Sequence, residues 1–397
     1  MANSLGSLWL KSFKRLTKAP RAQGRKLVKT LMEKTVRSLV TGALPVVNRT
    51  AKAAPRRRQK PAPTVPPKIT RSLKPAGAFW QKSYFVTPET SQIAIPRRMM
   101  YWLYLPSGAA ARAPLPLVVM LHGCKQTACD IATATRMNAL AERRGFAVLY
   151  PHQSSAADTH RCWHWYKRSM QRGEGDVALI AQMIAQVQQR YKLDRTRTYA
   201  AGLSAGAALA NILALRHPEL IAAVGLHSAP VFGTSDSTLS AYRAMQNGSL
   251  HAHDVVAREF LAEQAQFPGM PVMVIHGERD AVVRRINAEQ LAQQFLLINA
   301  AQLTGAEPVR RLYAGRLTGR SPRPAHHTDT WYAKRKPYVV HCNIAGLGHA
   351  WSGGDDSVDF TERAGPNASL MLWEFFEHHQ RVPDAETSKT TPATSKA

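Results

Sequence analysis

A serine between two glycines, in the stretch Gly-Leu-Ser-Ala-Gly at 202–206, is the part of the sequence best suited to covalent chemistry. Residues 197–201 before it predict a short buried strand, and the Ala- and Leu-rich residues 205–215 predict a helix that starts at once. Strand, Gly-x-Ser-x-Gly and helix together form a nucleophile elbow, a turn so sharp that only small flanking side chains fit. We therefore expect the Ser204 hydroxyl to be exposed at the helix start. The alternative is a turn in which Ser204 only caps the helix.

A serine hydroxyl attacks a carbonyl when a base takes its proton and a carboxylate orients that base. In hydrolases with an elbow, the chain order is Ser, then Asp or Glu, then His, the last two in loops that follow strands. Asp280 lies in HGERDAVV directly after the apolar run 272–275, and His349 lies in GLGHAW after the run 338–344. Carboxyl ends of parallel strands meet at one edge of a sheet. We therefore predict Ser204 as nucleophile, His349 as base and Asp280 as the orienting acid.

Other acids and histidines compete for these roles. Asp329, Asp355 and Asp356 lie near the predicted base in sequence, but no predicted strand positions them, and aspartate is most often a surface residue. His227 and His276 each stand at the end of a predicted strand, and we expect both to be structural.

The tetrahedral intermediate of acyl transfer needs N–H donors for its oxyanion. The N–H of Ala205 is one candidate, because this residue follows the nucleophile and opens the helix. The second donor is expected from a loop after an earlier strand, and LHGC at 121–124 ends such a strand. Because Gly123 lets the backbone turn inward, we predict the N–H of Cys124 as the second donor. A plain strand-ending turn is the alternative.

Three tryptophans lie in loops next to the predicted catalytic residues: Trp163, Trp165 and Trp351. Flat apolar rings suit the wall of an acyl or polyester groove, so we predict that these side chains contact substrate, with core packing as the alternative. The irregular stretch 230–267 is predicted to form a cap over the site.

Strand-like apolar runs alternate with helix-like stretches through the body of the chain. Strands are predicted at 99–105, 115–121, 146–150, 197–201, 222–226, 271–276 and 338–344, and helices at 131–143, 174–191, 205–215, 286–299 and 368–379. This alternation predicts an α/β fold with a mostly parallel central sheet and helices on both faces.

The 397 residues carry a formal net charge of +27, and most of this charge is N-terminal, since the first 75 residues hold 19 Lys and Arg against one acid, Glu33. Residues 1–45 are predicted to form a basic amphipathic arm that suits an anionic membrane or a polyester-granule surface, with a solvated tail as the alternative. Residues 46–77, rich in Pro, Lys and Arg, predict an extended linker. Nucleic acid is not expected as a partner, because the arginines at 56–58 have no aromatic residues between them.

Residues 78–380 are predicted to form a catalytic domain, and residues 381–397 are predicted to form a disordered tail. The four cysteines match no zinc-binding spacing, and we expect neither a metal nor a cofactor. No apolar run is long enough to span a membrane, and the N-terminus lacks the apolar stretch of a secretory signal. The absence of such a signal favours a cytoplasmic protein or one bound to a granule or membrane surface.

Six motifs, LHGCKQTACD, GFAVLYPHQ, RCWHWY, GLSAGAALA, HGERDAVV and GLGHAW, together resemble the esterases related to polyhydroxybutyrate (PHB) depolymerases, within the α/β-hydrolase fold. The resemblance runs from about residue 114 to the closing helix. It implies hydrolysis of carboxylic esters by Ser204, Asp280 and His349, with the backbone of Cys124 in the oxyanion hole. It also implies that Cys162 of the RCW motif forms a disulfide with Cys124. Many such relatives are extracellular, which is the alternative location.

Two departures from this family bear on the substrate. Ala207 and Ala208 stand where members often have Gly-Gly, and only a short tail follows the catalytic residues where many secreted depolymerases carry a polymer-binding domain. The alternatives are therefore a feruloyl or acetylxylan esterase with the same three residues, a less expected serine peptidase, and a surface- or nucleic-acid-binding protein on an inactive hydrolase scaffold.

Overall fold

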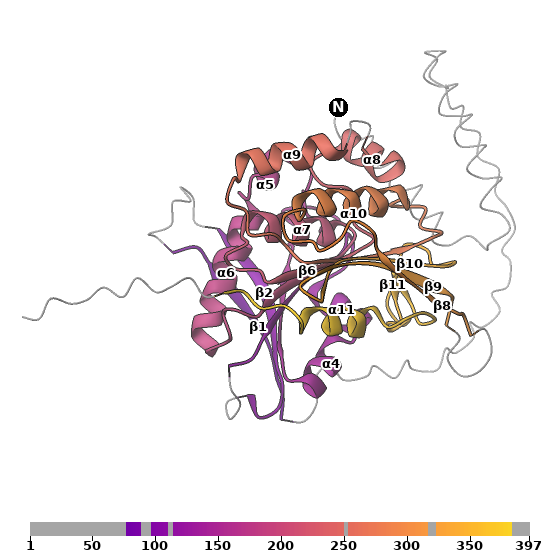
Figure 1. The fold of residues 1–397 in the computed structure, drawn as a ribbon. Helices are drawn as coiled ribbons and strands as arrows, with labels where there is room; N and C mark the ends of the chain where they lie inside the picture. Colours follow the sequence, from indigo (N-terminus) through magenta and orange to yellow (C-terminus); the bar gives the residue numbers. More distant parts are fainter. Residues whose placement is uncertain (1–76, 89–96, 110–113, 250–252, 317–322, 383–397) are drawn as a thin grey trace, which may run out of the picture. The chain divides into compact units, whose positions relative to one another are not determined.

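The structure of the protein is a computed structural model. It describes residues 77–88, 97–109, 114–249, 253–316 and 323–382 (Figure 1). The chain divides into two units, Met1–Lys68 and Ile69–Ala397, and all of the described residues belong to the second. The arm predicted at 1–45, nearly all of the linker predicted at 46–77 and the tail from 383 onward lie outside the described residues.

A ten-stranded sheet forms the centre of the second unit, within the described ranges, in the order β1-β2-β4-β3-β5-β6-β7-β10-β9-β8. The six middle strands, from β4 to β10, are parallel to their neighbours, and the outer strands at both ends pair antiparallel. The strands are β1 (Phe79–Val86), β2 (Arg98–Leu105), β3 (Leu117–Leu121), β4 (Ala147–His152), β5 (Thr198–Leu203), β6 (Ala223–His227), β7 (Val272–Gly277), β8 (Val309–Tyr313), β9 (His326–Ala333) and β10 (Lys336–Ile344).

Helices cover both faces of this sheet, with α7 and α10 on one face and α4 and α11 on the other (Figure 1). The first face carries α6 (Asp176–Tyr191), α7 (Ala205–Arg216) and α10 (Ile286–Ile298), and the second carries α3 (Ala128–Thr135), α4 (Met137–Arg144) and α11 (Ala368–Phe376). The middle strands are apolar on both sides; β3, for example, reads LVVML and is buried throughout. Strands covered on both faces need such continuous apolar runs. The predicted mostly parallel sheet between two helical layers is confirmed.

The helix predicted at 131–143 is instead two helices. Arg136 adopts a left-handed conformation, with φ of 52°, and separates α3 from α4. Before it, the hydroxyls of Thr133 and Thr135 donate to carbonyls one turn back in α3. Such back-bonding competes with a regular helix, which is a physical reason for the break at this point.

Residues 230–267 contain two helices, α8 (Thr238–Asn247) and α9 (His253–Glu263). Both pack against α10 and form an outer layer on the face that carries α7 (Figure 1). At the end of α8, the Gln246 side chain donates to the carbonyl of Val282, at 2.9 Å. The insertion therefore contacts the loop that follows β7, and its role as a cap stays a prediction.

The remaining elements are short: α5 (Arg168–Gln171), β11 (Trp351–Ser352) and β12 (Thr361–Glu362), the last two pairing with each other. Across the described ranges, no helix is both long and apolar enough to cross a membrane.

Candidate active site

Ser204 stands at the turn between β5 and α7. Its backbone angles are φ 57° and ψ −122°, a sparsely populated conformation that costs about 1–3 kcal/mol for a residue with a side chain. The strain is held by the surrounding structure, since the Ser204 N–H donates to the carbonyl of His227 at 3.0 Å. Ser204 is half-buried, and in the described part of the chain its hydroxyl makes no hydrogen bond. The turn therefore presents an unpaired hydroxyl at the start of a helix.

The two glycines of this turn are required by close backbone contacts. A Cβ on Gly202 would lie 2.5 Å from the carbonyl carbon of Gly206. A Cβ on Gly206 would lie 2.3 Å from the carbonyl oxygen of Leu121 and 2.5 Å from that of His122. The strand, the helix and the end of β3 therefore meet at distances that only glycine permits.

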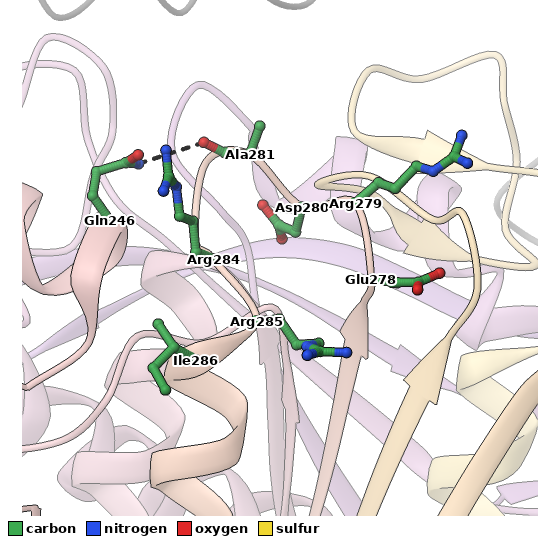
Figure 2. A pocket seen from close by; sticks show the side chains of 8 residues that line it. All are labelled: Gln246, Glu278, Arg279, Asp280, Ala281, Arg284, Arg285 and Ile286. Atoms are coloured by element: carbon green, nitrogen blue, oxygen red, sulfur yellow. Dashed lines mark hydrogen bonds between the residues drawn. The ribbon is translucent and has the colours of Figure 1, made fainter.

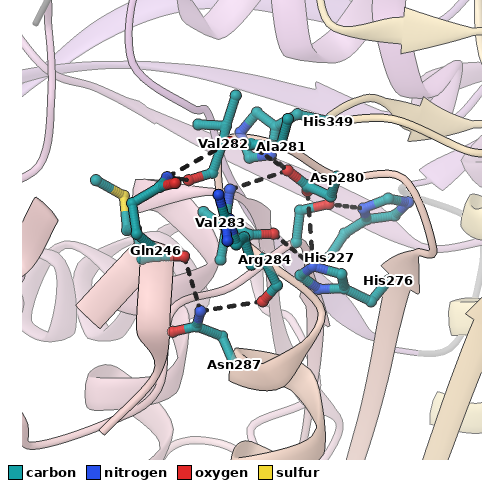
Figure 3. Close-up of polar contacts among 12 residues, drawn as sticks. His227, Gln246, His276, Asp280, Ala281, Val282, Val283, Arg284, Asn287 and His349 are labelled. Atoms are coloured by element: carbon teal, nitrogen blue, oxygen red, sulfur yellow. Dashed lines mark hydrogen bonds and ion pairs between the residues drawn. The ribbon is translucent and has the colours of Figure 1, made fainter. Parts of the chain in front are cut away.

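Asp280 and His349 come together from the loops after β7 and β10. The Nδ1 of His349 lies 2.7 Å from Oδ2 of Asp280 (Figure 3). The other carboxylate oxygen of Asp280 accepts N–H bonds from Val282 and Val283, both at 2.9 Å. Burial alone would raise the pKa of Asp280, but His349 and these donors outweigh it and bring the pKa to about 2. The carboxylate is thus charged at neutral pH and orients the His349 ring.

Ser204 and His349 belong to neighbouring segments, although within the described residues the Ser204 hydroxyl makes no hydrogen bond to His349. His227 connects the two segments, because its carbonyl accepts the Ser204 N–H and its Nε2 accepts the N–H of Ser352 at 3.3 Å, three residues after His349. Catalytic hydrogen bonds are often long or unmade before substrate binds. The structure therefore places Asp280 at hydrogen-bonding distance from His349 and leaves the Ser204 hydroxyl unpaired.

The competing acid Asp329 and both competing histidines have structural partners. His227 and His276 are fully buried, and burial lowers the pKa of His227 to about 3. The Nε2–H of His276 donates to the carbonyl of Val283, 2.8 Å away, and the same nitrogen lies 3.7 Å from Oδ2 of Asp280, so His276 supports the loop after β7. Asp329 forms an ion pair with Arg310 at the sheet edge.

The loop after β3 lies against the elbow. A Cβ on Gly123 would be 3.6 Å from Cβ of Ser204, which places this loop beside the nucleophile. In the described structure, the N–H groups of Cys124 and Ala205 donate to no protein acceptor. Unpaired backbone donors near a serine are what an oxyanion hole requires, and this role of Cys124 and Ala205 stays a prediction.

A disulfide joins Cys124 to Cys162, with a Cα–Cα distance of 4.3 Å. The partner loop is ordered by Asp158, whose carboxylate accepts the N–H groups of His160 and Cys162. The pairing implied by the family resemblance is thus formed in the structure, and it joins the loop after β3 to the segment after β4. Cys129 and Cys342 are free thiols.

The prediction that three tryptophans line a substrate groove is wrong. Trp163 and Trp351 are fully buried and Trp165 is 6% exposed, so none offers a ring to a ligand. The indole N–H of Trp163 donates to the carbonyl of His122 at 2.9 Å, and that of Trp351 donates to Ser369 at 3.2 Å. Large amphipathic rings bury apolar area and need a partner for the N–H, which both sites supply. Trp163 therefore contacts the loop after β3, and Trp351 contacts helix α11.

Replacing Trp163 by phenylalanine is therefore expected to lower stability, by about 1–3 kcal/mol, because the buried carbonyl of His122 loses its donor. The KM for a small ester should stay within about twofold. Trp373 is the matched control, since it is buried and its indole N–H has no partner in the described structure. Chemical denaturation of Trp163→Phe and Trp373→Phe measures the difference, and a large rise in KM without loss of stability would restore the groove interpretation.

A pocket of about 500 Å³ opens beside the acid loop (Figure 2). It borders Asp280 and is otherwise lined by Gln246, Glu278, Arg279, Ala281, Arg284, Arg285 and Ile286. The three guanidinium groups extend in different directions in Figure 2, and neither Ser204 nor His349 lines the pocket. No group of three or more metal-ligating side chains occurs within the described ranges.

A mostly parallel sheet between two helical layers, with a strained serine in a strand-to-helix turn and a hydrogen-bonded Asp–His pair at the same sheet edge, defines an α/β-hydrolase. The solved structure of an acetyl xylan esterase from Aspergillus awamori shares this fold, with a TM-score of 0.56 and 19% sequence identity, over 74% of this chain and 99% of that one. The sequence profile described as Esterase PHB depolymerase matches residues 99–316, more than half of the chain. The chain belongs to this family.

Curated relatives include enzymes with different names. Poly(3-hydroxyalkanoate) depolymerase C from Paucimonas lemoignei is 30% identical over 204 residues, which are 50% of this chain and 48% of that protein. Probable acetylxylan esterase A from Neosartorya fischeri is 27% identical over 209 residues, 50% of this chain and 55% of the relative. Feruloyl esterase B from Thermothelomyces thermophilus is 26% identical over 220 residues, 53% of this chain and 73% of the relative. The alignments thus span about half the length of the first two relatives.

Sequence reasoning missed two residues of the loop after β3. Gln126 accepts the N–H of Gly123 through Oε1, at 2.9 Å, and donates to the carbonyl of Asp359. His122 is fully buried and bonds within the same loop. The signal available in the sequence was only their place in the loop that follows an apolar strand.

Proposed function

We propose that this protein is a serine hydrolase that cleaves carboxylic esters through an acyl-enzyme. His349, oriented by ionised Asp280, takes the proton of Ser204 as its oxygen attacks the ester carbonyl. The N–H groups of Cys124 and Ala205 hold the oxyanion. His349 then protonates the departing alcohol, and activates water to release the acid. The observation that carries this proposal is the 2.7 Å bond between His349 and Asp280, at the sheet edge where the strained Ser204 also lies.

Labelling with a fluorophosphonate tests the nucleophile. We expect one covalent adduct, mapped by mass spectrometry to the peptide that contains Ser204, and none in Ser204→Ala. The control is Ser154→Ala, since Ser154 is an exposed serine two residues after β4 at the same sheet edge. An adduct that persists in Ser204→Ala contradicts the mechanism, and absence of any adduct favours an inactive scaffold that serves only in binding.

Hydroxyalkanoate oligomers and their polyester are the substrates that we propose first, with short-chain esters of the same acids. The support is membership of the family and the depolymerase among its relatives. Acetylated or feruloylated sugars are the second candidate, because acetylxylan and feruloyl esterases are also relatives. Comparing kcat/KM for hydroxybutyrate oligomers, acetylated xylo-oligosaccharides and methyl ferulate decides between them, and a tenfold preference for a sugar ester would overturn the first choice.

We further propose that the basic residues 1–45 bring the enzyme to a polyester granule or an anionic membrane. The support is the excess of Lys and Arg there, interleaved with apolar residues at helical spacing. Cosedimentation of the full chain, and of a chain that begins at residue 69, with polyester granules or anionic vesicles tests it. Equal binding by both chains would contradict this role.

A further inference from the structure

His122 is a fully buried imidazole placed directly before the peptide that carries the proposed oxyanion donor. Its Nε2 lies 3.1 Å from the backbone nitrogen of Gln153. A backbone N–H can only donate, so Nε2 accepts and the ring proton belongs on Nδ1. Nδ1 lies 2.9 Å from the carbonyl oxygen of Gly123, which can only accept. The hydrogen-bond network therefore fixes one tautomer, with Nδ1–H donating to Gly123.

The carbonyl of Gly123 and the N–H of Cys124 belong to the same peptide unit. This unit is planar and trans, as are all peptide bonds in the described structure, so its C=O and N–H point in opposite directions. A donor that holds the oxygen on one side thereby sets the direction of the N–H on the other. Gly123 lies beside Ser204, and its oxygen also accepts the Gln126 N–H at 3.3 Å. The bond from His122 is the shorter of the two.

His122 is itself held in place from several sides. The indole of Trp163 donates to its carbonyl, and the ring centroids of the two side chains are 5.2 Å apart. The His152 ring lies 5.7 Å away. Burial lowers the pKa of His122 to about 3, with smaller contributions from His152 and Arg161, so the ring is neutral at neutral pH. A neutral, immobile ring keeps the Nδ1 proton available.

We propose that His122 is a positioning residue, whose Nδ1–H fixes the Gly123–Cys124 peptide so that the Cys124 N–H faces the oxyanion formed at Ser204. This inference rests on the proposed function, because it assigns a role within the same oxyanion hole. It gives the His-Gly pair after β3 a task that a plain strand-ending turn does not have.

Two variants of nearly the same shape test the hydrogen bond from Nδ1–H of His122 to the Gly123 carbonyl. His122→Asn keeps a donor at the position of Nδ1, whereas His122→Leu removes it; both lose the acceptor for the Gln153 N–H, so their difference isolates the bond to Gly123. We expect kcat for a small aryl ester to be about tenfold to a hundredfold lower in His122→Leu than in His122→Asn, with KM within about twofold. The Ki of a trifluoromethyl ketone, whose adduct places an oxyanion in the hole, should rise by the same factor as kcat/KM falls. Equal kcat values in two folded variants would overturn the proposal.

If the variants do not fold, the protonation state of His122 in the unmodified protein tests the same hydrogen bond. In ¹⁵N-histidine-labelled protein, NMR should show His122 neutral at pH 7 with its proton on Nδ1. A proton on Nε2 would overturn the proposal, because Nδ1 could not then donate to Gly123. Failure of the proposed function is distinguishable, since it would appear as an unmodified protein that takes no label or as a fully active Ser204→Ala. Failure of this inference instead leaves Ser204 essential, with equal kcat values in His122→Asn and His122→Leu or with the His122 proton on Nε2.

Discussion

Replacing Asp280 by asparagine is expected to lower kcat by about 10⁴, with KM little changed. The carboxylate of Asp280 accepts from Nδ1 of His349 at 2.7 Å and holds the tautomer in which Nε2 is free to take a proton. An asparagine can turn its NH₂ toward Nδ1, which stabilises the other tautomer, with Nε2 protonated and unable to act as base. The charge that stabilises the imidazolium in the transition state is also lost. Steady-state kinetics with a soluble ester measures both parameters.

Glu278→Gln is the matched control for this loss. Glu278 lies two residues earlier in the same loop, is exposed, and accepts the Gly346 N–H at 3.2 Å through an oxygen that glutamine keeps. Removing this charge should change kcat by less than about twofold. Because His349 and the loop amides keep the pKa of Asp280 at about 2, the effect of Asp280→Asn should be the same across the neutral pH range. A loss below tenfold would mean that another group orients the base; His276, at 3.7 Å from Asp280, would be the first to examine.

The middle of the fold was predictable because each of its strands is apolar on both sides. Strands such as β3 and β7 are buried along their whole length, and the residues that follow them must emerge at one sheet edge. Sequence order alone therefore placed Asp280 and His349 in loops at that edge, and the structure brings the two side chains to hydrogen-bonding distance. The glycines of the elbow were also predictable, because their spacing in the sequence reflects a local backbone contact.

Of the four outer strands, β2 was predicted at 99–105, whereas β1, β8 and β9 were not predictable from local pattern. All five residues of β8 are exposed, two of them arginines, and the strand exists because it pairs with β9, where Arg310 opposes Asp329. Pairing of this kind depends on register between segments and not on an apolar run. The burial of Trp163 was missed for a similar reason, because its hydrogen-bond partner is a backbone carbonyl 41 residues earlier in the chain. Loop position in the sequence did not show which way the ring points.

Adding a single methyl group at Gly206 is expected to damage both stability and catalysis. In Gly206→Ala the new Cβ would lie 2.3 Å from the Leu121 oxygen and 2.5 Å from the His122 oxygen, closer than atoms approach without displacement. Both oxygens belong to the backbone, so the end of β3 must move and carry the oxyanion loop with it. Overpacking of this kind costs about 1–3 kcal/mol. A displacement of about 1 Å in a catalytic group lowers the rate roughly a hundredfold.

The control for the added methyl group is Gly348→Ala. A Cβ at Gly348 would have no atom within 4 Å, and its φ is not in the left-handed range, so the Tm should change by about 1 °C or less. Thermal unfolding of both variants separates the steric effect from the general effect of alanine on chain entropy, which is stabilising where the backbone permits it. Gly206→Ala should unfold several degrees lower and, at a temperature where it is folded, should have a kcat reduced about a hundredfold with the Cys124–Cys162 bond intact. A folded Gly206→Ala with normal kcat would mean that the loop after β3 can retreat without moving the oxyanion donor, and would remove the link between elbow packing and catalysis.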